Sequence, residues 1–110
     1  MVTVSIKNEY AEILSNFSNL EEAMELAIKR YTLEQITTKI AELKRKSAYY
    51  QNKYQIDYLT FCQKIERDEE FINAIENNID KLWEIDLSDW EFCDQGIKDW
   101  TNKLQTILLA

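Results

Sequence analysis

The sequence has 110 residues, a length typical of one compact domain. Hydrophobic residues make up 45% of it and charged residues 30%, so an ordered domain is expected rather than a disordered chain. No apolar run approaches the roughly 20 residues that span a bilayer, and the start lacks the basic and then apolar pattern of a secretory signal. We therefore expect a cytoplasmic protein with no membrane partner.

The formal charge of −7 is unevenly distributed along the chain. Residues 1–50 carry seven basic and seven acidic residues, whereas residues 51–110 carry six basic and thirteen acidic ones. Such an asymmetry indicates that the two halves face different partners. The alternative is that the acidic residues serve solubility alone.

In chain order, residues 2–7 come first and alternate between apolar and polar side chains. This period of two, with β-branched residues, predicts a short β-strand. A single strand forms no sheet, so its expected partner is the same strand of a second subunit. Asn8 is the expected cap of a short helix that runs to about Phe17. Asn19 with Glu22, or Ser18 with Glu21, forms a capping box for the next helix.

That next helix runs to Tyr54, as one helix or as two, because almost no helix breakers are present. A break at residues 55–57 precedes a short helix, and another helix follows Asp68. A second capping box, residues 88–91, predicts the start of the last helix. In that helix the apolar residues recur every three or four positions, which predicts packing along another helix. They are Trp90, Cys93, Ile97, Trp100, Leu104 and Ile107.

The residues needed for common catalytic and metal sites are missing. The chain has no histidine, which is the commonest general base and zinc ligand, and its one glycine, Gly96, leaves no phosphate-binding loop. Cys62 and Cys93 lie at apolar helical positions, which indicates buried thiols rather than a disulfide. We expect no enzyme activity, no cofactor and no metal.

The polar face of residues 2–7 suggests one binding role. Two such strands paired antiparallel form a ribbon that fits the major groove of DNA, and cations on the following helices contact phosphates. The order of a strand and two helices resembles the ribbon–helix–helix proteins and related small antitoxin domains over residues 2–45. The other interpretation is a solvent-exposed face of a dimerising strand. The DNA-binding candidates are Thr3, Ser5, Lys7, Lys29 and Arg30.

Two Trp-Glu pairs, at residues 83–84 and 90–91, flank an expected acidic turn. Tryptophan is enriched at interface hot spots, and surrounding acids favour a basic partner. The alternative is that the tryptophans belong to the core, as expected for Trp90 and Trp100 on the repeat. The partner-binding candidates are Glu84, Asp86, Asp89, Glu91, Phe92 and Asp94.

The aromatic-rich Lys53-Tyr54 segment, a short helix with Phe61, and the acidic Trp90-Glu91 segment follow one another in the chain. This order resembles small bacterial antitoxins over residues 20–108, although Gln55 stands where the pattern usually has glycine. The resemblance implies an acidic C-terminal half that holds a basic toxin and an N-terminal part that dimerises and binds operator DNA.

We therefore expect an all-α protein with a short N-terminal β-strand, a long helix and a C-terminal helical hairpin or bundle. Residues 1–50 form a dimerisation part with a second role in DNA binding, and residues 51–110 form an acidic partner-binding part of the same continuous domain. The expected function is that of an antitoxin in a toxin–antitoxin pair, acting as a homodimer. The alternative is a non-catalytic helical adaptor or assembly protein without DNA binding.

Overall fold

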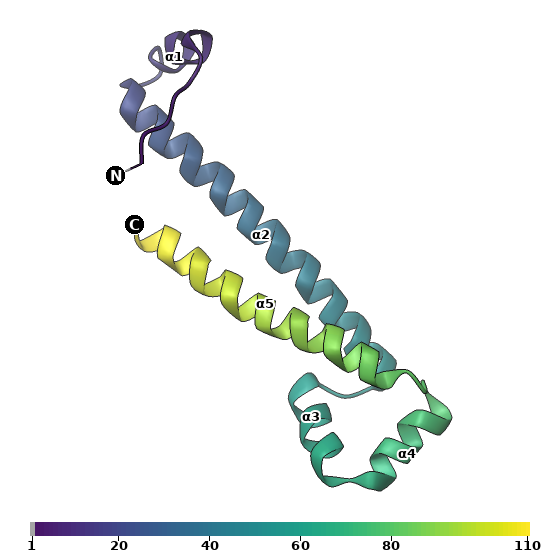
Figure 1. The fold of residues 1–110 in the computed structure, drawn as a ribbon. Helices are drawn as coiled ribbons and strands as arrows, with labels where there is room; N and C mark the ends of the chain where they lie inside the picture. Colours follow the sequence, from purple (N-terminus) through teal and green to yellow (C-terminus); the bar gives the residue numbers. More distant parts are fainter. Residues whose placement is uncertain (1) are drawn as a thin grey trace. The chain divides into compact units, whose positions relative to one another are not determined.

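The computed structural model describes residues 2–110, and these residues fold into five α-helices (Figure 1). The all-α class expected from one glycine and no proline is confirmed. The helices are α1 (Asn8–Leu14), α2 (Leu20–Tyr54), α3 (Tyr58–Arg67), α4 (Glu69–Asn78) and α5 (Trp83–Leu109).

The β-strand predicted at residues 2–7 is wrong, because the part of the chain that the structure describes contains no strand. Residues 2–7 have no regular structure, and Lys7, at their end, has an extended backbone (φ −68°, ψ 144°). An alternating pattern favours an extended chain, but a strand also needs a neighbouring strand to bind its N–H and C=O groups. The alternating pattern does not indicate whether such a neighbouring strand exists.

The N-terminal helices begin close to where the sequence places them. α1 begins at Asn8, but Lys7 is its N-cap and no side chain caps it, so the predicted Asn8 cap is wrong. The expected cap of α2 is confirmed, because the Asn19 side-chain oxygen accepts a hydrogen bond of 2.9 Å from the backbone N–H of Glu22.

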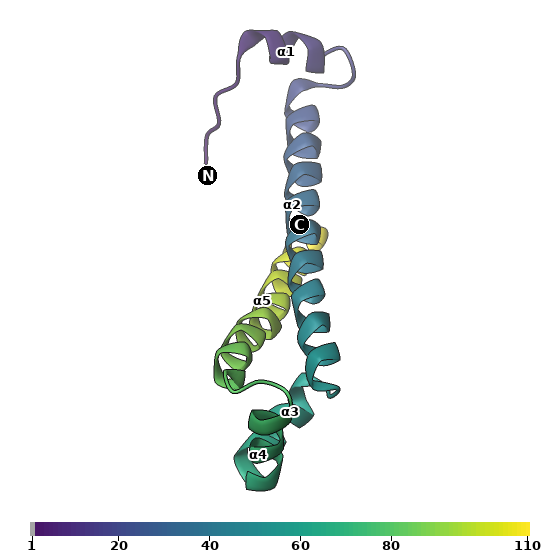
Figure 2. The ribbon, with the colours of Figure 1, turned by 90° about the vertical axis from the view of Figure 1, so that its right-hand side faces the viewer.

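Residues 20–54 form one helix rather than two, and α2 runs through 35 residues without interruption (Figure 2). The chain nevertheless divides into two compact units, one ending at Gln35 and one spanning Ile36–Ala110. The boundary therefore falls inside α2.

The turns of the second unit have clear local causes. Gln55, directly after α2, has a φ of 56°, a left-handed conformation that helix ends often adopt and that glycine favours. Asp57 and Asp68 cap α3 and α4 through hydrogen bonds from the backbone N–H groups of Thr60 (2.8 Å) and Phe71 (3.1 Å).

The core of the second unit is aromatic. Trp90 and Phe61 are fully buried, with ring centroids 5.5 Å apart. Tyr54 stacks on Trp90 at 6.2 Å, and Ile75 and Trp83 complete the buried cluster. Each helix of this unit contributes at least one of these side chains, so the cluster joins the end of α2 to α3, α4 and α5.

α5 packs along the second half of α2, as the spacing of its apolar residues predicts. The Trp90 indole N–H donates to the Ser47 hydroxyl at 3.0 Å. Cys93 is a fully buried free thiol, as predicted, whereas Cys62 is free but only partly buried. Further along, the backbone at Gly96 lies so close to Leu43 that an added Cβ would be 2.8 Å from its Cδ1. The absence of a side chain at residue 96 allows this close approach.

Candidate functional site

The candidate partner-binding residues lie on the first turns of α5, not in a turn between helices. α5 begins at Trp83, five residues before the start predicted from the Ser88 capping box. The Asp80 side chain accepts a hydrogen bond of 2.8 Å from the backbone N–H of Leu82, the residue at the helix start. Residues 84–94 are therefore held in a helix, which fixes the face that each side chain occupies.

Two of the predicted acidic residues are engaged inside the fold. Asp86 accepts hydrogen bonds from the Lys53 ammonium group at 2.6 Å and from the Tyr54 hydroxyl at 2.5 Å. Asp89 accepts one from the Tyr50 hydroxyl at 2.5 Å. These contacts join the start of α5 to the last turns of α2, so both carboxylates have a structural role.

The same contacts change the proton affinity of the groups on α2. The hydrogen bond to Asp89 raises the pKa of Tyr50 above its ordinary value, and burial together with the Asp86 contact raises the pKa of Tyr54. The hydrogen bonds to Asp80 and Asp86 raise the pKa of Lys53, while the Lys53 contact lowers the pKa of Asp80. These contacts therefore favour protonated tyrosines and a charged Lys53 paired with an ionised Asp80.

An exposed surface adjoins these contacts on the same turns of α5. Ile85 is 65% exposed and Phe92 is 64% exposed, and Ser88 lies between them at helical spacing. Together with Glu84 and Asp89 these residues line a shallow groove of about 520 Å³. We call these five residues the α5 surface. It combines two large apolar side chains with the exposed Glu84 and with Asp89, whose carboxylate also accepts the hydrogen bond from Tyr50.

The remaining acidic candidates differ in their surroundings. Glu91 is exposed. Asp94 is partly buried and forms an ion pair of 3.2 Å with Lys98, four residues further along α5. The pair is a local helix contact of small energy, so it leaves Asp94 available to solvent and to other groups.

The predicted tryptophan roles are partly confirmed. Trp90 is a core residue, whereas Trp100 is only partly buried and has the Lys103 ammonium group 4.3 Å from its ring centroid. Trp83 is buried as well, and its indole N–H donates to Glu76 at 3.1 Å. The exposed aromatic of α5 in this region is Phe92, as the sequence predicts.

Sequence reasoning did not name Ile85 and Ser88 as site residues. Their signal is the spacing of three and then four residues from Ile85 to Ser88 and Phe92, which places all three on one helix face once the helix begins at Trp83. It also did not name the α2 residues that bind the aspartates. Tyr50 and Tyr54 are four residues apart and meet Asp89 and Asp86, which are three apart.

The DNA-binding candidates lie in the first unit. Thr3, Ser5 and Lys7 are exposed in the segment before α1, and they are not in the strand that the ribbon model requires. Lys29 and Arg30 lie on α2, where Arg30 is exposed and Lys29 is partly buried. The structure therefore provides no ribbon that would present the first three side chains to a DNA groove.

Among residues 2–110, no group of three or more potential ligand side chains is placed to hold a metal ion. None of the helices that these residues form combines the length and the apolar character that a membrane crossing requires. Comparisons with protein-family models, with curated proteins and with solved structures find no match to the chain.

Proposed function

We propose that this protein acts by binding another protein through the α5 surface, without catalysis. The observation that carries the proposal is the exposure of Ile85 and Phe92, 65% and 64%, on a helix whose opposite face is buried against α2. Large apolar side chains grouped on a rigid surface and bordered by polar residues are typical of protein-binding sites.

The charge near these side chains indicates a basic partner. Glu84 lines the groove beside Ile85, and Glu91 is exposed next to Phe92 in the sequence. Residues 51–110 carry the whole net charge of −7. Such a field speeds the encounter with a positively charged protein, while the apolar side chains provide most of the contact energy.

In its specific form, the proposal is that the chain is the antitoxin of a bacterial toxin–antitoxin pair and occludes a basic toxin. This form rests on the resemblance of residues 20–108 to small antitoxins, and the exposed acidic and apolar groups of α5 are compatible with it. Autorepression through operator DNA belongs to the same resemblance, and Lys29 and Arg30 on α2 are its remaining cationic candidates.

The test uses the protein encoded by the neighbouring reading frame, which this proposal requires to be basic. Its binding is measured by titration calorimetry, and rescue of growth is measured on co-expression. Phe92→Ala should weaken binding about tenfold or more, because a central interface aromatic contributes about 2 kcal/mol or more. Leu59→Ala on α3 is the matched control, since Leu59 is 66% exposed and lies outside the α5 surface. Equal binding by wild type and Phe92→Ala would refute the assigned surface.

A helical adaptor without a DNA role is the second candidate. The observation in its favour is that residues 2–7 contain no strand, which removes the ribbon proposed to read DNA. The two candidates differ in a titration of the chain, alone and with its partner, against its own promoter DNA. Salt-sensitive binding at submicromolar concentration supports the repressor, and the absence of such binding supports the adaptor.

A further inference from the structure

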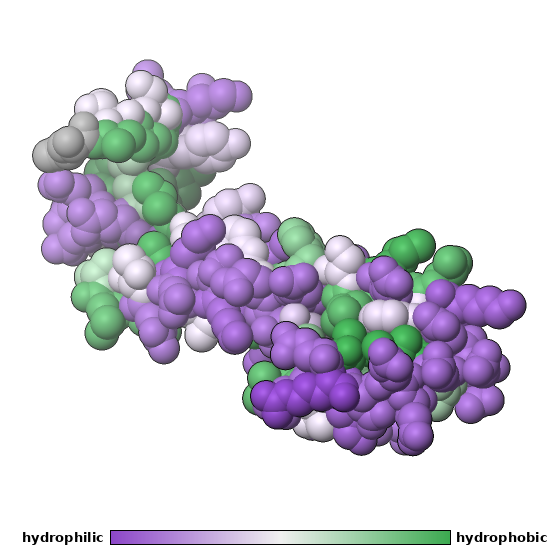
Figure 3. Space-filling view, turned by 60° about the horizontal axis from the view of Figure 1, so that its bottom comes forward, coloured by the Kyte–Doolittle hydropathy of each residue, from purple (hydrophilic) through white to green (hydrophobic). Residues whose placement is uncertain are grey.

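The first unit exposes its apolar side chains instead of burying them. No described residue up to Gln35 is buried, although eight large apolar side chains in this stretch are more than half exposed. Phe17 is 81% exposed and Tyr31 is 66% exposed. Figure 3 shows such hydrophobic side chains at the surface of the N-terminal part of the chain, at the upper left. Exposed apolar patches of this kind mark contact surfaces.

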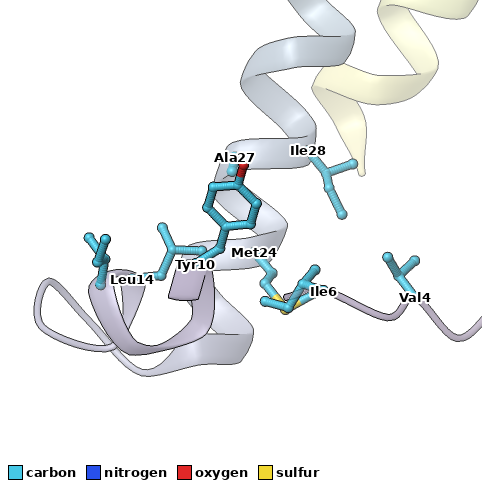
Figure 4. Close-up of a pocket in the computed structure, with 8 residues that line it drawn as sticks. Val4, Ile6, Tyr10, Leu14, Met24, Ala27 and Ile28 are labelled. Carbon is cyan, nitrogen blue, oxygen red and sulfur yellow. The ribbon is translucent and has the colours of Figure 1, made fainter. Parts of the chain in front are cut away.

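Four of these eight side chains line a groove together with four other apolar residues (Figure 4). It has a volume of about 330 Å³ and is lined by three segments of the first unit, and no lining residue carries a charge. The segment before α1 contributes Val4 and Ile6, and α1 contributes residues that include Ile13. From α2 come residues that include Met24 and Ile28. An uncharged apolar lining is suited to an apolar occupant and provides no site for a phosphate or an ammonium group.

We infer that a second copy of this chain covers this groove, forming a homodimer through helices α1 and α2. The chain itself carries suitable occupants, because Phe17, Leu26 and Tyr31 are exposed on the same unit. A two-fold dimer requires a self-complementary patch, which the groove of one copy and exposed apolar side chains of the other would form. This dimer uses helices and needs no β-strand at residues 2–7, where the structure has none.

The exposed area is large enough for such an interface. Tyr10, Phe17 and Tyr31 are 61%, 81% and 66% exposed. Since an aromatic side chain presents about 150–250 Å², these three expose roughly 300–500 Å². Five aliphatic side chains that are more than half exposed add to this. Their total over all faces of the unit is comparable to the roughly 800 Å² per partner that a specific interface buries, and it is an upper limit for the area around the groove.

The charges of α2 favour an antiparallel arrangement of the two copies. The first turns of α2 carry Glu21, Glu22 and Glu25, and the cations Lys29 and Arg30 follow within the same unit. When a second copy of this part of α2 runs antiparallel, its cations lie opposite the glutamates. A parallel copy would place like charges opposite each other. The proposed dimer is therefore antiparallel along α2.

The test is the mass of the full chain in solution, measured by sedimentation equilibrium from 1 µM to 1 mM. We expect a concentration-dependent mass that reaches twice the 13.1 kDa of one chain. Ile13→Glu and Ile28→Glu should each raise the dissociation constant about 100-fold or more, because every substitution occurs twice in a two-fold dimer. Leu59→Glu, at an exposed position on α3, should leave the mass unchanged.

Orientation is tested by charge reversal. Lys29→Glu with Arg30→Glu should weaken the dimer about tenfold at low salt, and adding Glu21→Lys and Glu22→Lys should restore it. All variants should keep the helical circular dichroism of the wild type, because the substituted side chains are not buried.

Two results would overturn the inference. The first is a chain that stays monomeric at 1 mM, whether hydrogen exchange finds the backbone amides of the groove open to solvent or protected by another part of the same chain. The second is a dimer that persists unchanged in both glutamate variants. This inference does not depend on the α5 surface, so loss of dimerisation and loss of partner binding are separate outcomes.

Discussion

Asp86 provides the sharpest test of how the start of α5 is held. Its carboxylate is 18% exposed and accepts hydrogen bonds from Lys53 at 2.6 Å and Tyr54 at 2.5 Å. Asp86→Ala removes both bonds and leaves the hydroxyl of Tyr54, a residue that is 5% exposed, without its acceptor. Lys53 keeps Asp80, at 2.7 Å, as a partner.

The expected loss of unfolding free energy is about 3 kcal/mol. A hydrogen bond to a charged group contributes about 1.5–3 kcal/mol, and a buried donor left unpaired costs about 1–3 kcal/mol. The retained Lys53–Asp80 pair limits the loss. Urea unfolding followed by tryptophan fluorescence measures it, and at a slope of roughly 1–3 kcal/mol per molar the midpoint should fall by about 1–3 M.

Glu84→Ala is the matched control. Glu84 lies on the same turns of α5 but is exposed, so its removal should change stability by no more than about 0.5 kcal/mol. In a cycle of Asp86→Ala and Tyr54→Phe, the two losses should not add, because the substitutions remove the same bond. If the free energy of unfolding of Asp86→Ala lies within about 0.5 kcal/mol of the wild-type value, the assigned structural role of Asp86 is wrong. Its carboxylate would then be free to bind a partner.

Three further predictions concern the same unit. Gly96→Ala gains about 1 kcal/mol of helix propensity but places a Cβ 2.8 Å from Cδ1 of buried Leu43. We therefore expect the free energy of unfolding to fall by about 1 kcal/mol, and a variant that is more stable in urea unfolding would contradict the close packing. Gln55→Gly should stabilise the fold by about 1 kcal/mol in the same assay, because Gln55 has a φ of 56°, and a destabilised variant would show that the left-handed turn is not strained. Stability should fall as pH rises above about 10, because the folded state keeps the protons of Tyr50 and Tyr54 when the unfolded chain loses them. The free energy of unfolding should fall by at most about 1.4 kcal/mol per pH unit for each tyrosine, and Tyr50→Phe should make this fall less steep. If Tyr50→Phe leaves the pH dependence unchanged, the pKa of Tyr50 is not raised in the folded state.

Periodicity predicted the parts of the fold that depend on a repeated pattern. The spacing from Trp90 to Ile107 predicted that α5 packs along another helix, and the buried Trp90 and Cys93 confirm the face. The same reasoning failed at residues 2–7, because an alternating pattern describes only an extended chain. Whether that chain becomes a strand depends on a neighbour elsewhere in space.

The helix start and the site needed information that is not local. Ser88 looks like a cap because serine suits that position, yet the Asp80 side chain and the contacts of Asp86 with α2 extend the helix back to Trp83. The sequence pointed correctly to an exposed Phe92 on an acidic segment. It did not separate Asp86, whose partners lie 32 and 33 residues away, from the exposed Glu84.

The contact between Ser47 and Trp90 also has a consequence for synthesis of the chain. These residues are 43 positions apart, so at about 5–20 residues per second Trp90 is added roughly 2–9 s after Ser47. From their own addition until that of Trp90, Tyr54 and Phe61 lack the indole against which they pack in the finished fold. A nascent chain that stops before α5 therefore presents unpaired aromatic rings, which are targets for chaperones and starting points for aggregation.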